Sequence, residues 1–524
     1  MKKILLTALL LPALAHAYQS GKTYHLTILH TNDTHGRFWP NERGEYGMAA
    51  HQTLVKQIRK EVQHKGGSLL ILHAGDINTG VPESDVHNAR PDIEAMNAIG
   101  YEAMALGNHE FDNPLQMLGM QEKWAKFPFI SANVRHKHSG KYLVKPYVML
   151  NKKGLRIAVV GLTTEETATA ANLVYTQNVS FDDTRRAASK MLNNLKRRQP
   201  DIKIALTHLG YNSDIGLAEA LPQQSFDLII GGHSHTTVCV DSEGRLKKDY
   251  RAGEACRPDF RNGTWIMQAG EWGKYLGRAD FTFKDGKLSL QSYRLIPVNL
   301  KYKTETADGK TEYVLYQKEI PQDEKLAGRL KKYQDEADEK LGIEVGSVTG
   351  KLEGDRSIVR HQATNLGRLI ARSQRERTGA DLSVMNSGGI RDSIQAGKVT
   401  YKDILRVQPF GNLVGYVGLT GAELRGYLQT VSQMKPGSGG YPQFDNVSFQ
   451  TDAEGKISNI QIGGKPLQDN QVYRLSLPDF LANGGDGYPK VADRPSYVNT
   501  GYVDADALKL YFQRHSPIDP AQFQ

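Results

Sequence analysis

The amino-acid sequence predicts a soluble α/β protein with two domains joined by one helix. The chain has 524 residues, which is more than one hydrophobic core usually accommodates, so at least two domains are expected. From residue 24 to about residue 298, short apolar runs alternate with helix-like segments, a pattern typical of layered α/β domains. Hydrophobic residues make up 39% of the chain and charged residues 23%, which is typical of a globular protein and argues against disorder.

The first residues have the pattern of an export signal. Lys2 and Lys3 precede the apolar run ILLTALLLPAL, and the AHA at 15–17 fits a cleavage site after Ala17. The apolar run is too short to span a bilayer. The sequence therefore predicts a signal peptide at 1–17 and a periplasmic protein without a stable membrane anchor.

Five apolar runs in the first half predict buried strands, and each run ends in polar or glycine residues. Helical patterns at 48–66 and 182–198 lie between some of them. Because open α/β sheets bind ligands at the carboxyl ends of their strands, we expect a functional site there. The predicted strands lie within 25–30, 68–76, 155–162, 202–210 and 226–235.

A single amphipathic helix separates the two halves. Apolar residues recur at helical spacing from Leu326 to Leu341, Asp323 supplies a start signal and Gly342 a stop. The predicted division is a first domain at 18–323, a linker or hinge helix at 324–344, and a mixed α/β domain at 345–524.

The predicted strand ends carry metal-ligand residue types in a fixed order: Asp-x-His at 33–35, Gly-Asp at 75–76, Gly-Asn-His-Glu at 107–110, His208, and Gly-His-Ser-His at 232–235. Each motif alone is most simply explained as a polar cap or a turn. All five in this order favour a two-metal centre, which needs Asp, His and Asn ligands and one bridging carboxylate.

This order of motifs resembles the calcineurin-like metallophosphatases. The stretches HTNDTHGR, ALGNHEFDNP, GGHSH, NSGGIRDS, VQPFGN and LANGGDGYP extend the resemblance to the bacterial periplasmic 5′-nucleotidase/UDP-sugar hydrolases, over essentially the whole mature chain. The resemblance implies a four-layer α/β/β/α metallophosphatase domain, a mixed α/β substrate-binding domain, and a hinge that lets the two rotate.

Carried over residue by residue, the resemblance implies two divalent ions, for which Zn²⁺, Mn²⁺ and Co²⁺ are all suitable. The first ion would be held by Asp33, His35, Asp76 and His235. The second would be held by Asp76, Asn108, His208 and His233, with Asp76 bridging. Near relatives have Gln where this chain has His235. Other branches, including 2′,3′-cyclic-nucleotide phosphodiesterases, have His there.

The resemblance also implies catalytic and substrate-binding residues. His109, oriented by Asp112, would act at the phosphate, although a purely supporting role beside the metals is the alternative. The implied substrate contacts are Arg356, Arg360 and Arg391 for phosphate, Asn386 and Asn412 as polar contacts, Phe410 and Phe480 as rings that sandwich the base, and Asp486 for the ribose.

Cysteine and charge content add two further expectations. Two cysteines in an exported chain, Cys239 and Cys256, predict one disulfide, with two free thiols as the alternative. The net charge is +9, or about +7 once Lys2 and Lys3 are removed. This charge suits small anionic substrates, whereas the absence of a dense basic block or a binding motif argues against nucleic acid as a partner.

The leading hypothesis is an exported two-metal phosphohydrolase that acts as a monomer on 5′-nucleotides and on UDP-sugars or other nucleotide pyrophosphates, by in-line attack of a metal-activated hydroxide. Within the same fold, a 2′,3′-cyclic-nucleotide phosphodiesterase with 3′-nucleotidase activity and an NAD pyrophosphatase are the alternatives. A non-catalytic periplasmic nucleotide-binding protein belongs to a different class. It predicts the loss of a metal ligand, and no ligand position is lost.

Overall fold

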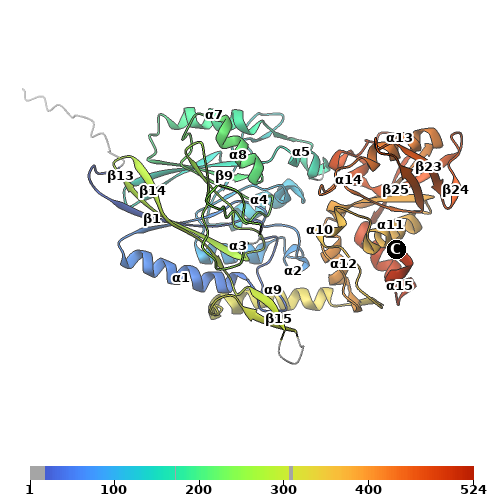
Figure 1. The fold of residues 1–524 in the computed structure, drawn as a ribbon, viewed down its shortest axis with the longest axis horizontal. Coiled ribbons are helices and arrows are strands. Elements are labelled where there is room, and N and C mark those ends of the chain that lie inside the picture. The colour runs from blue at the N-terminus through green and yellow to red at the C-terminus, as the bar shows by residue number, and fades with distance from the viewer. Residues whose placement is uncertain (1–17, 172, 249, 306–310) are drawn as a thin grey trace, which may run out of the picture.

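Two six-stranded sheets packed face to face form the centre of the first domain (Figure 1). The computed structural model describes residues 18–524 apart from 172, 249 and 306–310, so the predicted signal peptide lies outside the described residues. In spatial order, the first sheet contains β14 (Lys287–Pro297), β13 (Tyr275–Lys284), β1 (Tyr24–Thr31), β2 (Ser68–His73), β3 (Ala103–Ala105) and β4 (Phe129–Ile130). The second contains β11 (Asp259–Arg261), β12 (Thr264–Met267), β10 (Leu228–Ile230), β9 (Ile202–His208), β7 (Leu155–Thr163) and β6 (Tyr147–Lys152).

Helices cover the outer face of each sheet, which gives four layers. The core under the first sheet contains apolar side chains of α1, α3 and α4, and the core outside the second contains those of α7 and α8. A third core lies between the sheets. The helices of this domain are α1 (Met48–His64), α2 (Pro82–Asp85), α3 (Arg90–Ile99), α4 (Leu115–Trp124), α5 (Thr167–Ala170), α6 (Leu173–Thr176), α7 (Thr184–Leu195) and α8 (Tyr211–Ala220). This arrangement confirms the predicted α/β/β/α fold class.

Parallel pairing brings the carboxyl ends of the central strands together. β1, β2, β3 and β4 run parallel in the first sheet, as do β7, β9, β10 and β12 in the second. The antiparallel hairpin of β13 and β14 completes the first sheet by pairing with β1. Two short antiparallel pairs lie outside these sheets: β5 (Val134–His136) with β8 (Val179–Phe181), and β15 (Lys301–Glu305) with β16 (Thr311–Leu315).

The predicted linker helix is α9 (Glu324–Leu341) (Figure 1). It begins at Asp323, whose side chain accepts the Leu326 amide N–H at 3.0 Å. Leu326 and Leu330 are buried in the same core as α1 and α3, so the first half of the helix is fixed to the first domain.

The second domain is a mixed α/β unit, as predicted. Its main sheet has the order β21 (Pro442–Asp445), β18 (Leu382–Asn386), β25 (Val472–Pro478), β20 (Leu413–Thr420) and β26 (Tyr497–Val503). Smaller sheets pair β17 (Glu344–Val348) with β19 (Gly397–Thr400), and β22 (Val447–Thr451) with β23 (Ile457–Ile462) and β24 (Lys465–Pro466). Its helices are α10 (Arg356–Val359), α11 (Asn365–Thr378), α12 (Tyr401–Val407), α13 (Gly421–Ser432), α14 (Asp479–Ala482) and α15 (Asp504–His515).

A cluster of charges fastens the domains together on the side of α9. Glu83 of α2 accepts from Lys402 of α12 at 2.8 Å, and Lys402 also reaches Asp338 of α9 at 2.8 Å. The Glu83 side chain is only 5% exposed, whereas that of Asp338 is 50% exposed, so water is largely excluded from the first of these ion pairs and reaches the second.

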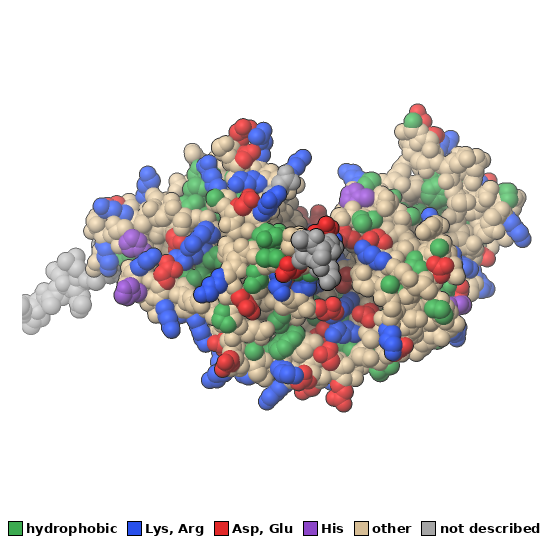
Figure 2. Space-filling view, turned by 60° about the horizontal axis from the view of Figure 1, so that its bottom comes forward, with side chains coloured by type: hydrophobic (Ala, Val, Ile, Leu, Met, Phe, Trp, Pro, Cys, Tyr) green, Lys and Arg blue, Asp and Glu red, His purple; other side chains and the backbone are tan. Residues whose placement is uncertain are grey.

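The sequence predicts a basic protein without a membrane anchor, and the surface charges and the helices relate to these two predictions. Figure 2 shows a hollow between the two lobes, with Lys and Arg side chains interspersed among Asp and Glu over the face in view. Across the described part of the chain, none of the helices combines the length and apolar character needed to cross a membrane.

Candidate metal centre

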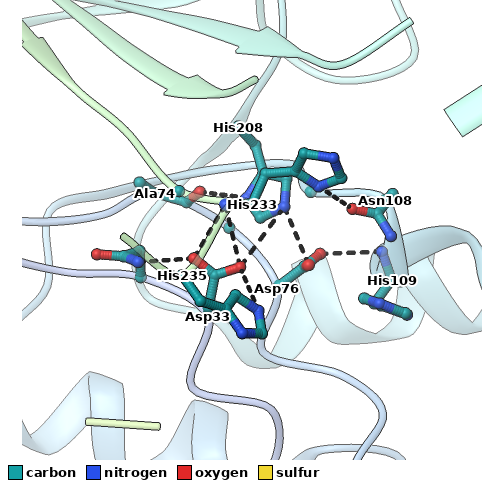
Figure 3. Close-up of polar contacts among 12 residues, drawn as sticks. Asp33, Ala74, Asp76, Asn108, His109, His208, His233 and His235 are labelled. Carbon is teal, nitrogen blue, oxygen red and sulfur yellow. Dashed lines mark hydrogen bonds and ion pairs between the residues drawn. The ribbon is translucent and has the colours of Figure 1, made fainter. Parts of the chain in front are cut away.

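All seven predicted metal ligands come together where the two sheets meet. Figure 3 labels each of them except His35. Asp33 and His35 follow β1, Asp76 follows β2, and Asn108 follows β3 in the first sheet. From the second sheet, His208 ends β9, and His233 and His235 follow β10. Three sets of their side chains, one of which includes His109, have ligand atoms within 4.8 Å of one another.

The first set is Asp33, His35 and His235. His235 Nε2 lies 3.3 Å from Asp33 Oδ1 and 3.1 Å from His35 Nε2. His35 Nδ1 donates to the Thr79 carbonyl at 2.8 Å, which leaves Nε2 of His35 as the acceptor that faces the other two. A backbone carbonyl on the far nitrogen is the usual way in which a ligating histidine is held.

The second set is Asp76, His208 and His233, with Asn108 beside it. His208 Nε2 lies 3.0 Å from Asp76 Oδ2, and His208 Nδ1 donates to the Ala74 carbonyl at 2.7 Å. His233 Nδ1 lies 2.8 Å from Asn108 Oδ1. Asp76 Oδ2 is also 3.9 Å from His35 Nε2, so Asp76 lies between the two sets, where a bridging ligand is expected.

The ligand loops have unusual backbone geometry. The φ angles are 49° at Asp33, 48° at His35, 60° at Asp76, 79° at His233 and 57° at His235. Side chains other than glycine rarely adopt this left-handed region, and each instance costs on the order of 1–3 kcal/mol. Strained conformations gathered at one place indicate a functional site.

A glycine lets two of these loops approach closely. A Cβ atom at residue 107 would lie 2.1 Å from Asp76 Oδ1, so only Gly107 fits. Glu110 then clamps the same loops: its carboxylate accepts the backbone N–H of Asp76 at 3.0 Å and of Gly107 at 2.6 Å. The Glu of the Gly-Asn-His-Glu motif therefore orders the backbone and does not face the metal positions.

Neighbouring charges within the centre shift the pKa values of its side chains. Burial raises the pKa of Asp33, but His235 and His208 outweigh burial and bring it down to about 2. Burial lowers the pKa of His208, yet Asp76 and Asp33 raise it to about 10. The two carboxylates of the centre therefore favour positive charge beside them.

The donor set fits divalent cations. His208 Nε2 is buried and makes no hydrogen bond of good geometry with any described residue, although Asp76 lies close. Two carboxylates, four imidazoles and one amide oxygen are hard and borderline donors of the kind that Zn²⁺, Mn²⁺ and Co²⁺ accept. Two ligands of one ion lie about as close together as this imidazole nitrogen and carboxylate oxygen do, so the pair fits a shared ion.

His109 and Asp112 form a pair beside the metal positions. His109 Nδ1 donates to Asp112 Oδ2 at 2.5 Å, and Thr79 Oγ1 donates to the same oxygen at 2.7 Å. Burial lowers the pKa of His109, but Asp112 and Asp76 raise it above its ordinary value. Asp112 thus fixes the direction of an imidazole that borders the cavity.

A cavity of about 370 Å³ joins this centre to the second domain. The predicted substrate residues all line it, together with Asp76, Asn108, His109, Asp112, His233 and His235; these substrate residues are Arg356, Arg360, Asn386, Arg391, Phe410, Asn412, Phe480 and Asp486. Asp33, His35 and His208 lie beneath it, fully buried. The structure thus brings every predicted metal and substrate residue to one place, although the role of each stays a prediction.

Three arginines face the metal centre from the second domain. Burial and the neighbouring guanidinium of Arg356 lower the pKa of Arg360 to about 9 and that of Arg391 to about 10. None of the three forms an ion pair within the described part of the chain, and Arg356 Nη1 lies 3.2 Å from His235 Nδ1. Arg356 is exposed and Arg360 and Arg391 are half-buried. Cations that crowd one another without a carboxylate partner among the described residues create a site for an anion.

The remaining substrate positions line the same cavity from the second domain. The Phe410 ring stacks on His109 with 5.8 Å between centroids, so one of its faces is covered. Gly485 packs against the Phe480 ring so closely that a Cβ would lie 2.5 Å from it. Asn386 Nδ2 donates to Asp486 Oδ2 at 2.7 Å. The base sandwich between the two rings stays a prediction.

Two acidic residues that the sequence reasoning did not single out contact the histidines. Glu166 Oε2 lies 3.4 Å from His233 Nε2, and Glu271 Oε2 contacts His235 Nδ1. Both follow strands, β7 and β12, at the same sheet edge as the predicted ligands. The sequence did hold a signal for them: TTEE at 163–166 and QAGE at 268–271 also follow apolar runs, as the predicted ligands do.

The predicted disulfide between Cys239 and Cys256 is not formed in this structure, which has both as free thiols. The two segments are nonetheless adjacent, since the Val240 N–H donates to the Arg257 carbonyl at 2.9 Å. The thiol of Cys256 lowers the pKa of Cys239 to about 7. Because the thiols are neighbours, the disulfide stays a prediction for the oxidised protein.

Sequence comparison assigns the class to which this fold and site belong. The profile described as calcineurin-like phosphoesterase matches residues 26–237, which include every predicted metal ligand. The first domain is therefore that of a calcineurin-like phosphoesterase. The profile described as 5′-nucleotidase, C-terminal domain, matches residues 344–493.

Full-length relatives then give the particular family. The chain is 52% identical to the protein UshA of Yersinia enterocolitica, over 98% of this chain and 95% of that one. It is 51% identical to a 5′-nucleotidase of Vibrio cholerae, over 97% and 94%. The crystal structure of a 5′-nucleotidase precursor from Thermus thermophilus matches with a TM-score of 0.76 and 29% identity, over 94% and 96%. The chain belongs to the UshA/5′-nucleotidase family, as the motifs predicted.

Proposed function

We propose that this metal-dependent nucleotide hydrolase cleaves the phosphate from 5′-nucleotides and also cleaves nucleotide pyrophosphates such as UDP-sugars. The observation that carries the proposal is the shared cavity, in which three arginines of one domain, none of them ion-paired with a described residue, face the metal centre of the other. Such a cavity suits a substrate with an anionic end and a planar, uncharged end, and a nucleotide has both.

Two metal ions would be bound by the ligand side chains that the loops after the strands bring together. Asp33, His35 and His235 would bind one ion, Asn108, His208 and His233 the other, and Asp76 both. When bound, two divalent cations supply positive charge to the phosphoryl oxygens and lower the pKa of water.

The chain's own residues would position the substrate. Arg356, Arg360 and Arg391 bind the phosphate from the side opposite the metal positions and spread its charge over planar guanidinium groups. His109, held by Asp112, presents its Nε2 to the phosphate or to the leaving oxygen.

The nucleoside would occupy the second domain. Phe480 offers a ring for stacking, which is tolerant of base identity. Asp486, whose pKa is raised by burial, lies where it would accept from ribose hydroxyls. The apolar leader at 1–17 supports export to the periplasm as part of the same proposal.

A substrate panel on the purified mature protein tests the proposal. We expect the protein stripped of metal with EDTA to be inactive, and Mn²⁺ or Co²⁺ to restore phosphate release from AMP and cleavage of UDP-glucose. NAD and 2′,3′-cyclic AMP are the comparison substrates. Full activity after chelation would refute the metal-dependent mechanism, and turnover confined to the cyclic nucleotide or to NAD would reassign the substrate.

A further inference from the structure

Glu271 contacts a predicted metal ligand without being one itself. It follows β12, and its Oε2 contacts His235 Nδ1. Its other oxygen, Oε1, accepts from Lys274 Nζ at 2.8 Å.

His235 has one nitrogen on each side of this arrangement. Nε2 faces Asp33 Oδ1 at 3.3 Å and His35 Nε2 at 3.1 Å, whereas Nδ1 faces Glu271. A neutral imidazole carries a single N–H. When Nδ1–H donates to Glu271, the lone pair of Nε2 points toward the metal position. Arg356 also lies 3.2 Å from Nδ1, but a guanidinium is a donor only and cannot take this role.

The same geometry occurs at two other ligands. His35 and His208 each donate from Nδ1 to a backbone carbonyl, that of Thr79 and of Ala74, and each aims Nε2 inward. At His235 the acceptor is a carboxylate, which is a stronger acceptor than a carbonyl and raises the donor strength of the opposite nitrogen.

The segment that carries Glu271 is fixed to the ligand loop. The Trp272 N–H donates to the Asp33 carbonyl at 2.7 Å, and Asn32 Nδ2 donates to the Gly270 carbonyl at 2.5 Å. The Arg37 guanidinium packs 3.8 Å from the centre of the Trp272 ring. Glu271 is therefore held in place by residues on both sides of it and does not depend on His235 for its position.

We propose that Glu271 is a positioning residue that fixes the tautomer of His235 and thereby strengthens binding of the one ion held by Asp33, His35 and His235. The inference rests on the metal centre of the proposed function and deepens it. Because a glutamine amide at 235 has no tautomer to fix, the effect of Glu271 depends on an imidazole at that position.

A double-mutant cycle on metal affinity tests this dependence. Apo protein is titrated with Mn²⁺ by calorimetry for wild type, Glu271→Gln, His235→Gln and the double variant. We expect Glu271→Gln to weaken one of two binding events by about 10- to 100-fold and to change the other by less than about 3-fold. In the His235→Gln background, the same Glu271→Gln change is expected to have less than about 3-fold effect.

Controls separate the possible failures. Glu344→Gln removes a carboxylate that Lys398 Nζ contacts at 2.9 Å in the second domain, away from every ligand loop, and should leave both affinities unchanged. Thermal unfolding of each apo variant reports folding independently of metal. Two unaltered binding events in Glu271→Gln, or an equal loss in both backgrounds, would overturn the role of Glu271. Failure of the wild type to bind two ions would overturn the proposed function instead.

Discussion

Replacing Asp76 by asparagine removes a charge from the metal centre and keeps its shape. The asparagine retains an oxygen at the Oδ1 position, which accepts the His109 N–H at 2.9 Å, so the loop after β3 should hold its place. The lost charge affects both predicted ions, because Asp76 takes part in two of the three ligand sets.

The size of the effect follows from Coulomb's law. A unit charge about 4 Å from a dication interacts by about 8 kcal/mol at an effective dielectric constant of about 20. If desolvation of the carboxylate and the ion cancels half to three quarters of this, about 2–4 kcal/mol remains per ion. That corresponds to a loss of about 30- to 1,000-fold in affinity. We therefore expect Asp76→Asn to bind neither ion tightly at micromolar Mn²⁺ and to lose nearly all phosphate release from AMP.

Equilibrium dialysis against Mn²⁺, followed by measurement of metal content, checks the affinities, and phosphate release checks the activity. Asp92→Asn is the matched control, since Asp92 is equally buried but is held by Ser84 Oγ at 2.5 Å, outside the three ligand sets. Two ions bound by Asp76→Asn with wild-type affinity, together with wild-type turnover, would refute the bridging role.

Three further predictions concern the second domain and the helix between the domains. Phe480→Ala should raise KM for AMP by about 5- to 150-fold, since base stacking is worth about 1–3 kcal/mol; an equal rise for ribose 5-phosphate, which has no base, would count against it. Leu330→Ala should lower the free energy of unfolding by about 2–5 kcal/mol in urea titrations, because Leu330 is fully buried; a change below about 1 kcal/mol would mean that α9 is not anchored there. Burial raises the pKa of Asp504 from 3.8 to about 7, so the unfolded chain releases this proton at lower pH than the folded one does. Wild-type stability should therefore fall relative to Asp504→Asn between about pH 4 and pH 7, and melting temperatures at pH 5 and pH 8 that move in parallel would contradict this.

Local patterns in the sequence were enough to predict the elements that carry the centre. The run at 25–30 is β1 (Tyr24–Thr31), and the helix expected at 48–66 is α1, which ends at His64 before two glycines. The run at 226–235 contains only the short β10 (Leu228–Ile230), because its polar end forms the loop that carries His233 and His235. Apolar periodicity predicts where a strand lies, whereas the ligand residues determine where it ends.

Contacts between distant parts of the chain were beyond such patterns. No local sequence pattern predicts that β13 pairs with β1 or that the Phe410 ring stacks on His109. Glu271 was missed for a related reason: its function depends on which nitrogen of His235 it meets, and this is a property of three-dimensional geometry. The gathering of the arginines opposite the metals followed from the family resemblance, because spacing alone is also compatible with solvated surface residues.

Five of the seven predicted ligands have a left-handed backbone, which lowers the stability of the fold. Selection for heat resistance and selection for catalysis should therefore favour different residues at these positions. Glycine would relax each of these positions, so a ligand there is retained at a cost to the folded state that only bound metal offsets. Variants selected for heat resistance in a chelating medium should accumulate glycine or asparagine at Asp33, His35, Asp76, His233 and His235 first. When metal is added during selection, these five positions should instead be the last to be substituted.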